Sequence, residues 1–267
     1  MNPADSEGRV AHEQMIKWRT FALLLASSII VSLLVIPYSL SLTSIGGQTR
    51  PAPPLLIVMA TILSTLFMSS IAIPIGLWLG EQIGLGAPVL EAWVSGDPGA
   101  SRQFRAEAPI AIGAGLVTGV LVLLLSAAVG PLMPPPKQTF APPAVWQGLL
   151  ASISAGVNEE IWMRLGLMTL VAWVLTRIFG GKNVGPVAGW TSIIFATLVF
   201  GALHLPQASM LFGLSLPVVV WALAGNGLAG IVFGWLYWRR SLLSAMLAHF
   251  STDIILHVIA PAFSFIR

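Results

Sequence analysis

The sequence predicts an all-α fold, a polytopic transmembrane helical bundle of about seven spanning helices. Hydrophobic residues make up 56% of the 267 positions and charged residues only 9%, and the mean hydropathy is +0.88. Soluble domains carry about a quarter charged residues, so this chain has too little charge to cover a soluble surface. Its apolar runs also recur at the length that crosses a bilayer, roughly 20 residues.

The apolar runs define seven predicted spans, at residues 20–42, 54–80, 108–133, 145–177, 186–205, 211–237 and 241–263. The fourth run is too long for one straight crossing, because about 33 residues at 1.5 Å each give a length on the order of 50 Å. We expect this helix to tilt, to break near Gly156 or to project from the membrane. The longest polar stretch, Glu81 to Glu107, lies between the second and third spans and is expected to hold a short surface helix.

The placement of Lys and Arg orients these spans. With the N-terminus inside, nine basic residues fall on the cytoplasmic side and three on the outer side, which is the bias of the positive-inside rule. We therefore expect residues 1–19 to be a cytoplasmic tail and the C-terminus to lie outside. The basic residues are scattered single charges, so no nucleic-acid partner is expected. The chain has no Cys, which excludes disulfides and Cys-based zinc sites.

Nearly all ionisable residues predicted within the spans lie in the second half of the chain. Such groups are costly in the hydrocarbon region and are functional candidates by default. The fourth, fifth and seventh spans carry them, as Glu159, Glu160, Arg164, His204, His249, Asp253 and His257. This concentration indicates one polar site built by three helices.

Helical spacing predicts how some of these groups pair. Glu160 and Arg164 are four residues apart, so they share a helix face and can form an ion pair, whereas Glu159 has no local partner and is left for acid–base chemistry. His249 and Asp253 show the same four-residue spacing. The ion pair alone would be ordinary structure, and the histidine–aspartate stripe alone could be interhelical glue. We expect His257 to be structural.

Three short patterns occur in order on these helices. Residues 159–164 fit EExxxR, residues 200–204 fit FxxxH, and residues 249–253 fit HxxxN/D. Together they resemble the signature of the CPBP family, the CAAX-processing and bacteriocin-processing intramembrane endopeptidases. The resemblance covers about residues 145–260, and we take 141–267 as a CPBP-like protease core. Residues 20–140 form transmembrane helices without recognised motifs.

The resemblance implies roles for the first two patterns. Glu159 matches the catalytic glutamate that activates water, and His204 matches the histidine that assists it. Glu160 and Arg164 match the pair that holds the site in shape, with Phe200 in structural support.

The third pattern implies that His249 and Asp253 bind the developing oxyanion. The eukaryotic-type CAAX enzymes carry Asn at the position of Asp253, and an ionised Asp cannot donate a hydrogen bond as Asn can. Asp253 is therefore protonated, or it orients His249, or the site is arranged differently.

Two mechanisms fit these residue types. We predict a metal-free reaction without cofactor, in which Glu159 is the base and His249 steadies the oxyanion. Zinc is the alternative, with Glu159, His204 and His249 as ligands and an open water position. Counting residues from the predicted inner ends puts Glu159 and His204 at similar depth, with His249 on the order of 10 Å shallower.

The expected function is an intramembrane endopeptidase that cleaves a membrane-associated peptide or protein substrate, with prenylated peptides suggested by the resemblance. We expect an integral protein of a bacterial plasma membrane, with the lipid bilayer as its other partner. A catalytically silent family member acting in bacteriocin immunity or partner binding is one alternative. A proton-coupled transporter is another, although transporters often place broken helices in both halves of the chain.

Overall fold

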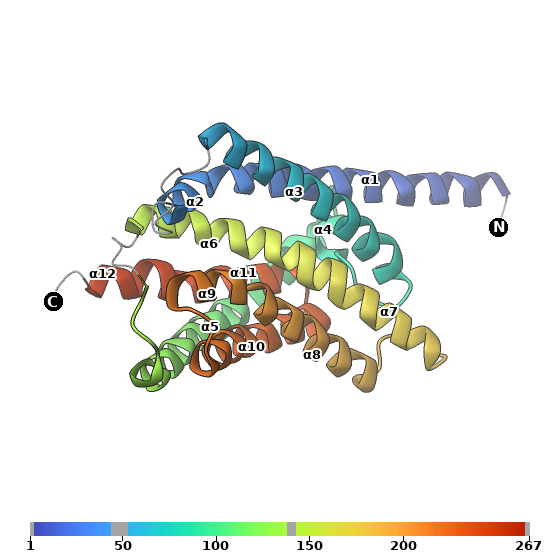
Figure 1. Cartoon of the computed structure of the whole chain (residues 1–267). Helices are drawn as coiled ribbons and strands as arrows, with labels where there is room; N and C mark the ends of the chain where they lie inside the picture. The colour runs from blue at the N-terminus through green and yellow to red at the C-terminus, as the bar shows by residue number, and fades with distance from the viewer. Residues whose placement is uncertain (1–2, 44–52, 138–142, 265–267) are drawn as a thin grey trace.

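The computed structural model describes residues 3–43, 53–137 and 143–264, and the regular structure within these ranges is entirely helical (Figure 1). Seven helical segments are long and apolar enough to cross a membrane, which confirms the predicted fold class. They are Val10–Ser41, Pro54–Leu79, Pro98–Leu132, Val145–Ile178, Pro186–Phe212, Leu216–Arg239 and Leu242–Phe263. Arg50 and Arg267, which entered the charge argument, lie outside the described residues.

Most spans are built from more than one helical element. In chain order these are α1 Pro3–Leu34, α2 Ile36–Thr43, α3 Pro54–Pro74, η2 Ile75–Leu79, α4 Pro88–Ser95, α5 Pro98–Val129, η3 Gly130–Leu132, α6 Val145–Glu160, η4 Ile161–Met168, α7 Thr169–Ile178, α8 Pro186–Leu203, α9 Leu205–Phe212, α10 Leu216–Arg239, α11 Leu242–Asp253, η5 Ile254–Ile259 and α12 Ala260–Ser264. The segments η2, η4 and η5 are π-helical, and η3 is a 3₁₀ turn.

The first and third spans extend further than the hydropathy pattern indicates, whereas the second matches its predicted bounds within one residue. Helix α1 begins at Pro3, so most of the predicted tail continues the first span as helix. The short helix expected in the polar stretch is present as α4 and ends at Gly96, whose φ of 83° suits glycine. Helix α5 then begins ten residues before the predicted start, because Asp97 caps it by accepting a hydrogen bond from the Gly99 amide at 2.7 Å.

The fourth span does not break at Gly156. Helix α6 runs through that position, and its backbone packs closely against α11, since a Cβ on Gly156 would lie 3.1 Å from the Met246 carbonyl oxygen. The helix instead widens into η4 directly after Glu160. The extra length is taken up by α7, whose turn into α8 extends beyond the ends of α10 and α11 (Figure 1).

The predicted start of the sixth span at residue 211 is wrong. Helix α8 ends at Leu203, and a second helix, α9, follows at an angle with Pro206 in its first turn. Gly213 ends α9 with a φ of 79°, and α10 begins only at Leu216. The apolar sequence of α9 conceals this helix break, which places His204 at the junction of α8 and α9.

Helix α11 packs against both α5 and α6, while α10 pairs with α8 and α1 with α3. The contact between α11 and its neighbours is close because glycines face it. A Cβ on Gly115 of α5 would overlap the Ala248 carbonyl of α11, and one on Gly148 of α6 would overlap the carbonyl of His257 in η5, which continues α11. The fourth, fifth and seventh spans are accordingly more buried than the first three.

Contacts at one end of the bundle join ends of the first, second, fourth and sixth spans. Lys17 pairs with Glu81, and Arg177 donates a hydrogen bond to Gln82 at 2.6 Å. The Gly86 amide donates to the Tyr237 hydroxyl at 3.1 Å. These contacts fit spans that alternate in direction, as the charge pattern requires. Which end faces the cytoplasm stays a prediction.

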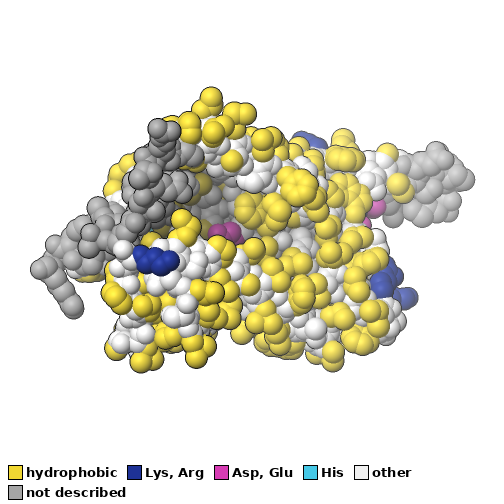
Figure 2. All heavy atoms as spheres, in the orientation of Figure 1, with side chains coloured by type: hydrophobic (Ala, Val, Ile, Leu, Met, Phe, Trp, Pro, Cys, Tyr) yellow, Lys and Arg dark blue, Asp and Glu magenta, His cyan; other side chains and the backbone are white. Residues whose placement is uncertain are grey.

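The outer surface is largely apolar. Figure 2 shows a face dominated by hydrophobic side chains, among which an acidic side chain is visible in a hollow. Leu63, Phe67 and Leu198 are 61%, 66% and 58% exposed on their helices. Such a surface is suited to lipid rather than water, and the chain is an integral membrane protein.

Candidate active site

The two adjacent glutamates of α6 face different surroundings. Glu160 is completely buried, and its Oε1 accepts a hydrogen bond from Nη1 of Arg164 at 2.9 Å, which is the ion pair expected from their spacing. Glu159 lies about 100° further around the helix, and its side chain is 30% exposed. The structure therefore separates a sealed carboxylate from an accessible one.

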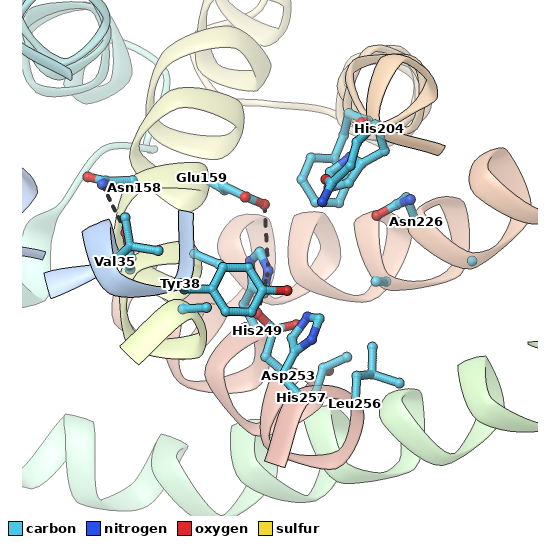
Figure 3. Close-up of a pocket in the computed structure, with 18 of the residues that line it drawn as sticks. Val35, Tyr38, Asn158, Glu159, His204, Asn226, His249, Asp253, Leu256 and His257 are labelled. Atoms are coloured by element: carbon cyan, nitrogen blue, oxygen red, sulfur yellow. Dashed lines mark hydrogen bonds and ion pairs between the residues drawn. The ribbon is translucent and has the colours of Figure 1, made fainter. Parts of the chain in front are cut away.

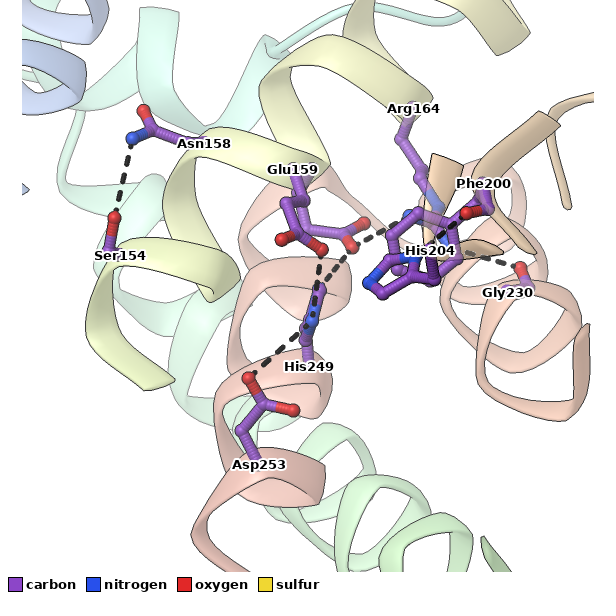
Figure 4. A network of polar contacts seen from close by, with 10 residues as sticks. Ser154, Asn158, Glu159, Arg164, Phe200, His204, Gly230, His249 and Asp253 are labelled. Carbon is purple, nitrogen blue, oxygen red and sulfur yellow. Dashed lines mark hydrogen bonds and ion pairs between the residues drawn. The ribbon is translucent and has the colours of Figure 1, made fainter. Parts of the chain in front are cut away.

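His249 of α11 lies between Glu159 and Asp253 (Figure 4) and also contacts Glu160. Its Nδ1 donates to Glu160 Oε1 at 2.7 Å. Its Nε2 is 3.7 Å from Glu159 Oε2 and 3.7 Å from Asp253 Oδ2. Both distances are too long for hydrogen bonds, so a small group bound at Nε2 has both carboxyl groups within reach.

Two phenylalanines enclose the buried ion pair. The guanidinium carbon of Arg164 lies 5.0 Å from the ring centre of Phe200 and 5.3 Å from that of Phe233, which is cation–π range. The ring of Phe233 also stacks on His249 at 4.6 Å with an interplanar angle of 20°. Phe200 was expected in support of the site. Phe233 was not, because nothing in the apolar sequence of α10 distinguishes it.

His204 is held by the end of its own helix. Its Nδ1 lies 2.8 Å from the Phe200 carbonyl oxygen, four residues earlier. Because a carbonyl oxygen only accepts, Nδ1 carries the proton, and in the neutral ring Nε2 is left as an acceptor. The FxxxH pattern thus combines a histidine anchored at the helix end with the ring of Phe200 against Arg164.

A cavity of about 710 Å³ joins these groups, and Glu159, His204, His249 and Asp253 all line it. Figure 3 shows Glu159 and His204 directed toward it from different helices. The cavity is lined mainly by apolar atoms, with a minority of polar ones. It is a concave, largely apolar site with a few convergent polar groups, as binding sites generally are.

The cavity extends toward α2 and α9 and includes residues that sequence reasoning missed or set aside. Tyr38 of α2, Trp221 and Asn226 of α10, and His257 all line it. His257 was expected to be structural, yet it borders the cavity, and its ring packs edge-on against Tyr38 at 6.2 Å. A single tyrosine or asparagine in an apolar run carries no pattern that could have identified it.

The predicted mismatch in depth is absent, since His249 reaches within 3.7 Å of Glu159. Residue counting placed His249 too shallow because it took all inner helix ends as level. The α7–α8 turn extends beyond the start of α11 (Figure 1). The larger number of residues between that turn and Glu159 therefore brings Glu159 to the same depth as His249. The side chains of Glu159, Glu160 and His249 bridge the remaining distance between α6 and α11.

The first two spans hold α6 in place through buried polar contacts. The Asn158 side chain accepts from the Ser28 hydroxyl at 2.5 Å and donates to Ser32 at 2.8 Å. Ser69 hydrogen-bonds Ser28 at 2.7 Å and accepts from the Trp162 indole at 2.9 Å. The four-residue spacing of Ser28 and Ser32 was a usable signal for this cluster, because it places two hydroxyls on one helix face.

The arrangement does not fit a metal centre within the described ranges. No group of three or more His, Asp or Glu side chains there is placed to hold a metal ion. His249 uses Nδ1 for Glu160, and its Nε2 is 3.7 Å from the Glu159 carboxylate. We derive no step through a metal, and the metal-free reaction stays a proposal.

One comparison with known proteins adds to this geometry. Residues 141–255 match the family model described as type II CAAX prenyl endopeptidase Rce1-like. The match begins before α6 and ends just beyond α11, so it spans the three patterns that build the site. No curated protein matches the chain, and no solved structure does.

Proposed function

We propose that the chain is an active intramembrane endopeptidase of the CPBP family that hydrolyses a membrane-associated peptide by glutamate-activated water, a proposal supported by the Rce1-like match over residues 141–255. One observation carries the proposal. His249 Nε2 lies 3.7 Å from Glu159 and 3.7 Å from Asp253 at the wall of an accessible cavity. A base, a hydrogen-bond donor and room for a peptide thus occur together.

In the proposed reaction, Glu159 holds a water molecule and takes its proton as the oxygen attacks the peptide carbonyl carbon. His204 assists by accepting a hydrogen bond from the same water at Nε2. The carbon–nitrogen bond then breaks, and the proton on Glu159 passes to the departing amine. Water is consumed, one carboxylic acid and one amine are formed, and Glu159 returns to its starting form.

The oxyanion is proposed to form beside His249. The Glu160 carboxylate accepts a hydrogen bond from Nδ1–H, and in the doubly protonated ring Nε2–H is the proposed donor to the oxyanion. Stacking on Phe233 fixes the plane of the ring. Asp253 contributes a second hydrogen bond from its carboxylic acid form.

The substrate class follows from the cavity and from the family. A largely apolar cavity within the transmembrane bundle suits a peptide that carries a lipid or an apolar segment. The matched family model is described as a CAAX prenyl endopeptidase, and we propose a membrane-associated, prenylated peptide as the first substrate to test. A silent immunity or partner-binding role, or proton-coupled transport, is not favoured by a specific feature of the site.

The test compares purified wild type with Glu159→Gln, which keeps the size of the side chain and removes the base. Both are reconstituted with labelled membrane-associated peptides, including a farnesylated CAAX peptide, and products are identified by mass spectrometry. Glu13→Gln changes an exposed glutamate of α1 and serves as the matched control. We expect cleavage by wild type and the control, and none by Glu159→Gln.

Adding a strong chelator distinguishes the metal-free reaction from a zinc-dependent one. Unchanged cleavage supports the metal-free reaction, whereas loss that zinc restores would replace it with a metal site on Glu159, His204 and His249. Binding of a peptide without cleavage by wild type would overturn the enzymatic proposal in favour of a silent family member.

A further inference from the structure

Asn226 is a polar residue in the middle of the apolar helix α10. The helix runs from Leu216 to Arg239 and has no charged residue before its last turn. A polar side chain within a transmembrane helix usually serves as interhelical glue or lines a substrate path. The contacts of Asn226 distinguish these two roles.

Asn226 does not join α10 to another helix. Its Nδ2 donates to the carbonyl oxygen of Ala222, one turn earlier on the same helix, at 2.8 Å. Across the described part of the chain, this is the hydrogen bond that its side chain makes. One N–H and the Oδ1 atom therefore remain for a ligand. A residue that joins two helices needs a partner on the neighbouring helix, and this hydrogen bond stays within α10.

The amide is directed at the candidate active site. Asn226 lines the same cavity as Glu159 and His204, and Figure 3 shows its side chain pointing into that cavity as His204 does. One turn further along α10, the Gly230 carbonyl accepts from Arg164 at 3.3 Å. Helix α10 thus reaches the site at two successive turns, once through the buried ion pair and once through an amide that faces the cavity.

A carboxamide offers an acceptor and a donor side by side, which is the complement of a peptide unit. The nearby walls are apolar, with Val122, Trp221 and Phe233 among them. A peptide entering such a space loses water, and its backbone groups need replacement partners. The Asn226 amide can supply these hydrogen-bond partners whatever side chains the peptide carries.

We propose that Asn226 binds the substrate, hydrogen-bonding a backbone amide of the peptide close to the bond that Glu159 attacks. The inference rests on the proposed function, since it concerns the same cavity and a peptide ligand. It assigns one residue of the recognition surface to α10, outside the three patterns that carry the chemistry.

The first measurement is binding without turnover. A fluorescent farnesylated CAAX peptide is titrated into Glu159→Gln in detergent, with and without Asn226→Leu, which keeps the size of the side chain and removes both hydrogen-bonding groups. We expect roughly tenfold weaker binding, in keeping with the loss of one or two hydrogen bonds. Ser64→Ala is the matched control, because Ser64 also lines the cavity and bonds a carbonyl of its own helix.

A second measurement changes the peptide instead of the protein. A series of peptides carries one ester in place of one amide, at successive positions around the cleaved bond, so that each lacks a single backbone N–H. With Asn226 present, one position should weaken binding by several-fold, and that position should lose its effect in Asn226→Leu. In the cleaving protein, Asn226→Leu should raise KM more than it lowers kcat.

The outcomes separate the two proposals. Equal sensitivity to every ester position in both proteins, or an unchanged affinity in Asn226→Leu, overturns the role of Asn226 while leaving cleavage intact. Failure of wild type to bind or cleave any peptide overturns the proposed function and this inference with it. If one ester position weakens binding only when Asn226 is present, that result supports both the proposed function and the role of Asn226.

Discussion

Nδ1 of His249 lies 2.7 Å from Oε1 of Glu160, the same oxygen that Arg164 binds at 2.9 Å. One carboxylate oxygen therefore holds both the structural arginine and the proposed oxyanion-binding histidine. Sequence spacing assigned Glu160 to Arg164 alone. The structure gives it a second task, since it sets the orientation of the imidazole beside Glu159.

Glu160→Gln should unfold more easily than wild type, because it leaves the buried Arg164 without its counter-charge. Breaking a buried ion pair costs about 3–5 kcal/mol. Glu159→Gln should be nearly as stable as wild type, since the contact between Glu159 and His249, at 3.7 Å, is too long for a hydrogen bond. Thermal unfolding in detergent, followed by tryptophan fluorescence, compares the two variants. Equal midpoints for both would contradict the division of roles between the two glutamates.

Asp253→Asn should retain peptide cleavage within about tenfold of wild type, whereas Asp253→Leu should lose about 100-fold. The amide keeps the size of the side chain and donates the hydrogen bond that the carboxylic acid is proposed to supply, and one oxyanion donor contributes about 100- to 1,000-fold. The measurement is kcat/KM with the farnesylated peptide. An Asn variant as inactive as Glu159→Gln would show instead that Asp253 acts as a carboxylate.

Phe233→Leu should lower kcat/KM by roughly 2- to 10-fold without abolishing cleavage. The ring stacks on His249 and faces Arg164, and an aromatic pair contributes about 0.5–1.5 kcal/mol beyond its buried area. Phe195→Leu changes an exposed phenylalanine of α8 and is the control. If both variants lost activity equally, the effect would lie in general packing rather than in the histidine.

Asn158→Leu should destabilise the protein by about 1–2 kcal/mol, because it removes the contacts to Ser28 and Ser32 that tie α6 to α1. Thermal unfolding of Asn158→Leu, Ser28→Ala and the double variant measures the coupling. We expect the double variant to lose less than the sum of the single losses. Fully additive losses would mean that the two side chains act independently.

The spans could be predicted from sequence because length and hydropathy alone decide which segments cross a bilayer. The Glu160–Arg164 pair was equally accessible, since residues four apart share a helix face. The contact between Glu160 and His249 was not, because it depends on how α6 and α11 cross. The break at His204 was concealed because α8 and α9 are both apolar and only Pro206 and Gly213 mark the change.

Residues that complete the cavity had no pattern to identify them. Tyr38, Asn226 and Phe233 are single residues in helices that do not carry the three patterns, and only packing brings them to the site. Asn158 differs, because the paired serines on α1 pointed to a polar contact across helices. Burial and neighbours, rather than residue type, distinguish these positions from the many similar ones that face lipid.

Helix α11 meets α5 backbone to backbone at Gly115, and η5, which continues α11, meets α6 in the same way at Gly148. It can neither slide nor rotate there without steric overlap, so the segment that carries His249 and Asp253 is held in a fixed position. The adaptation needed to admit different peptides then falls on the rim formed by α2 and α9, where Tyr38 and Leu211 border the cavity. Selection for new substrates, or the design of an inhibitor, can therefore work on that rim and leave the chemistry untouched.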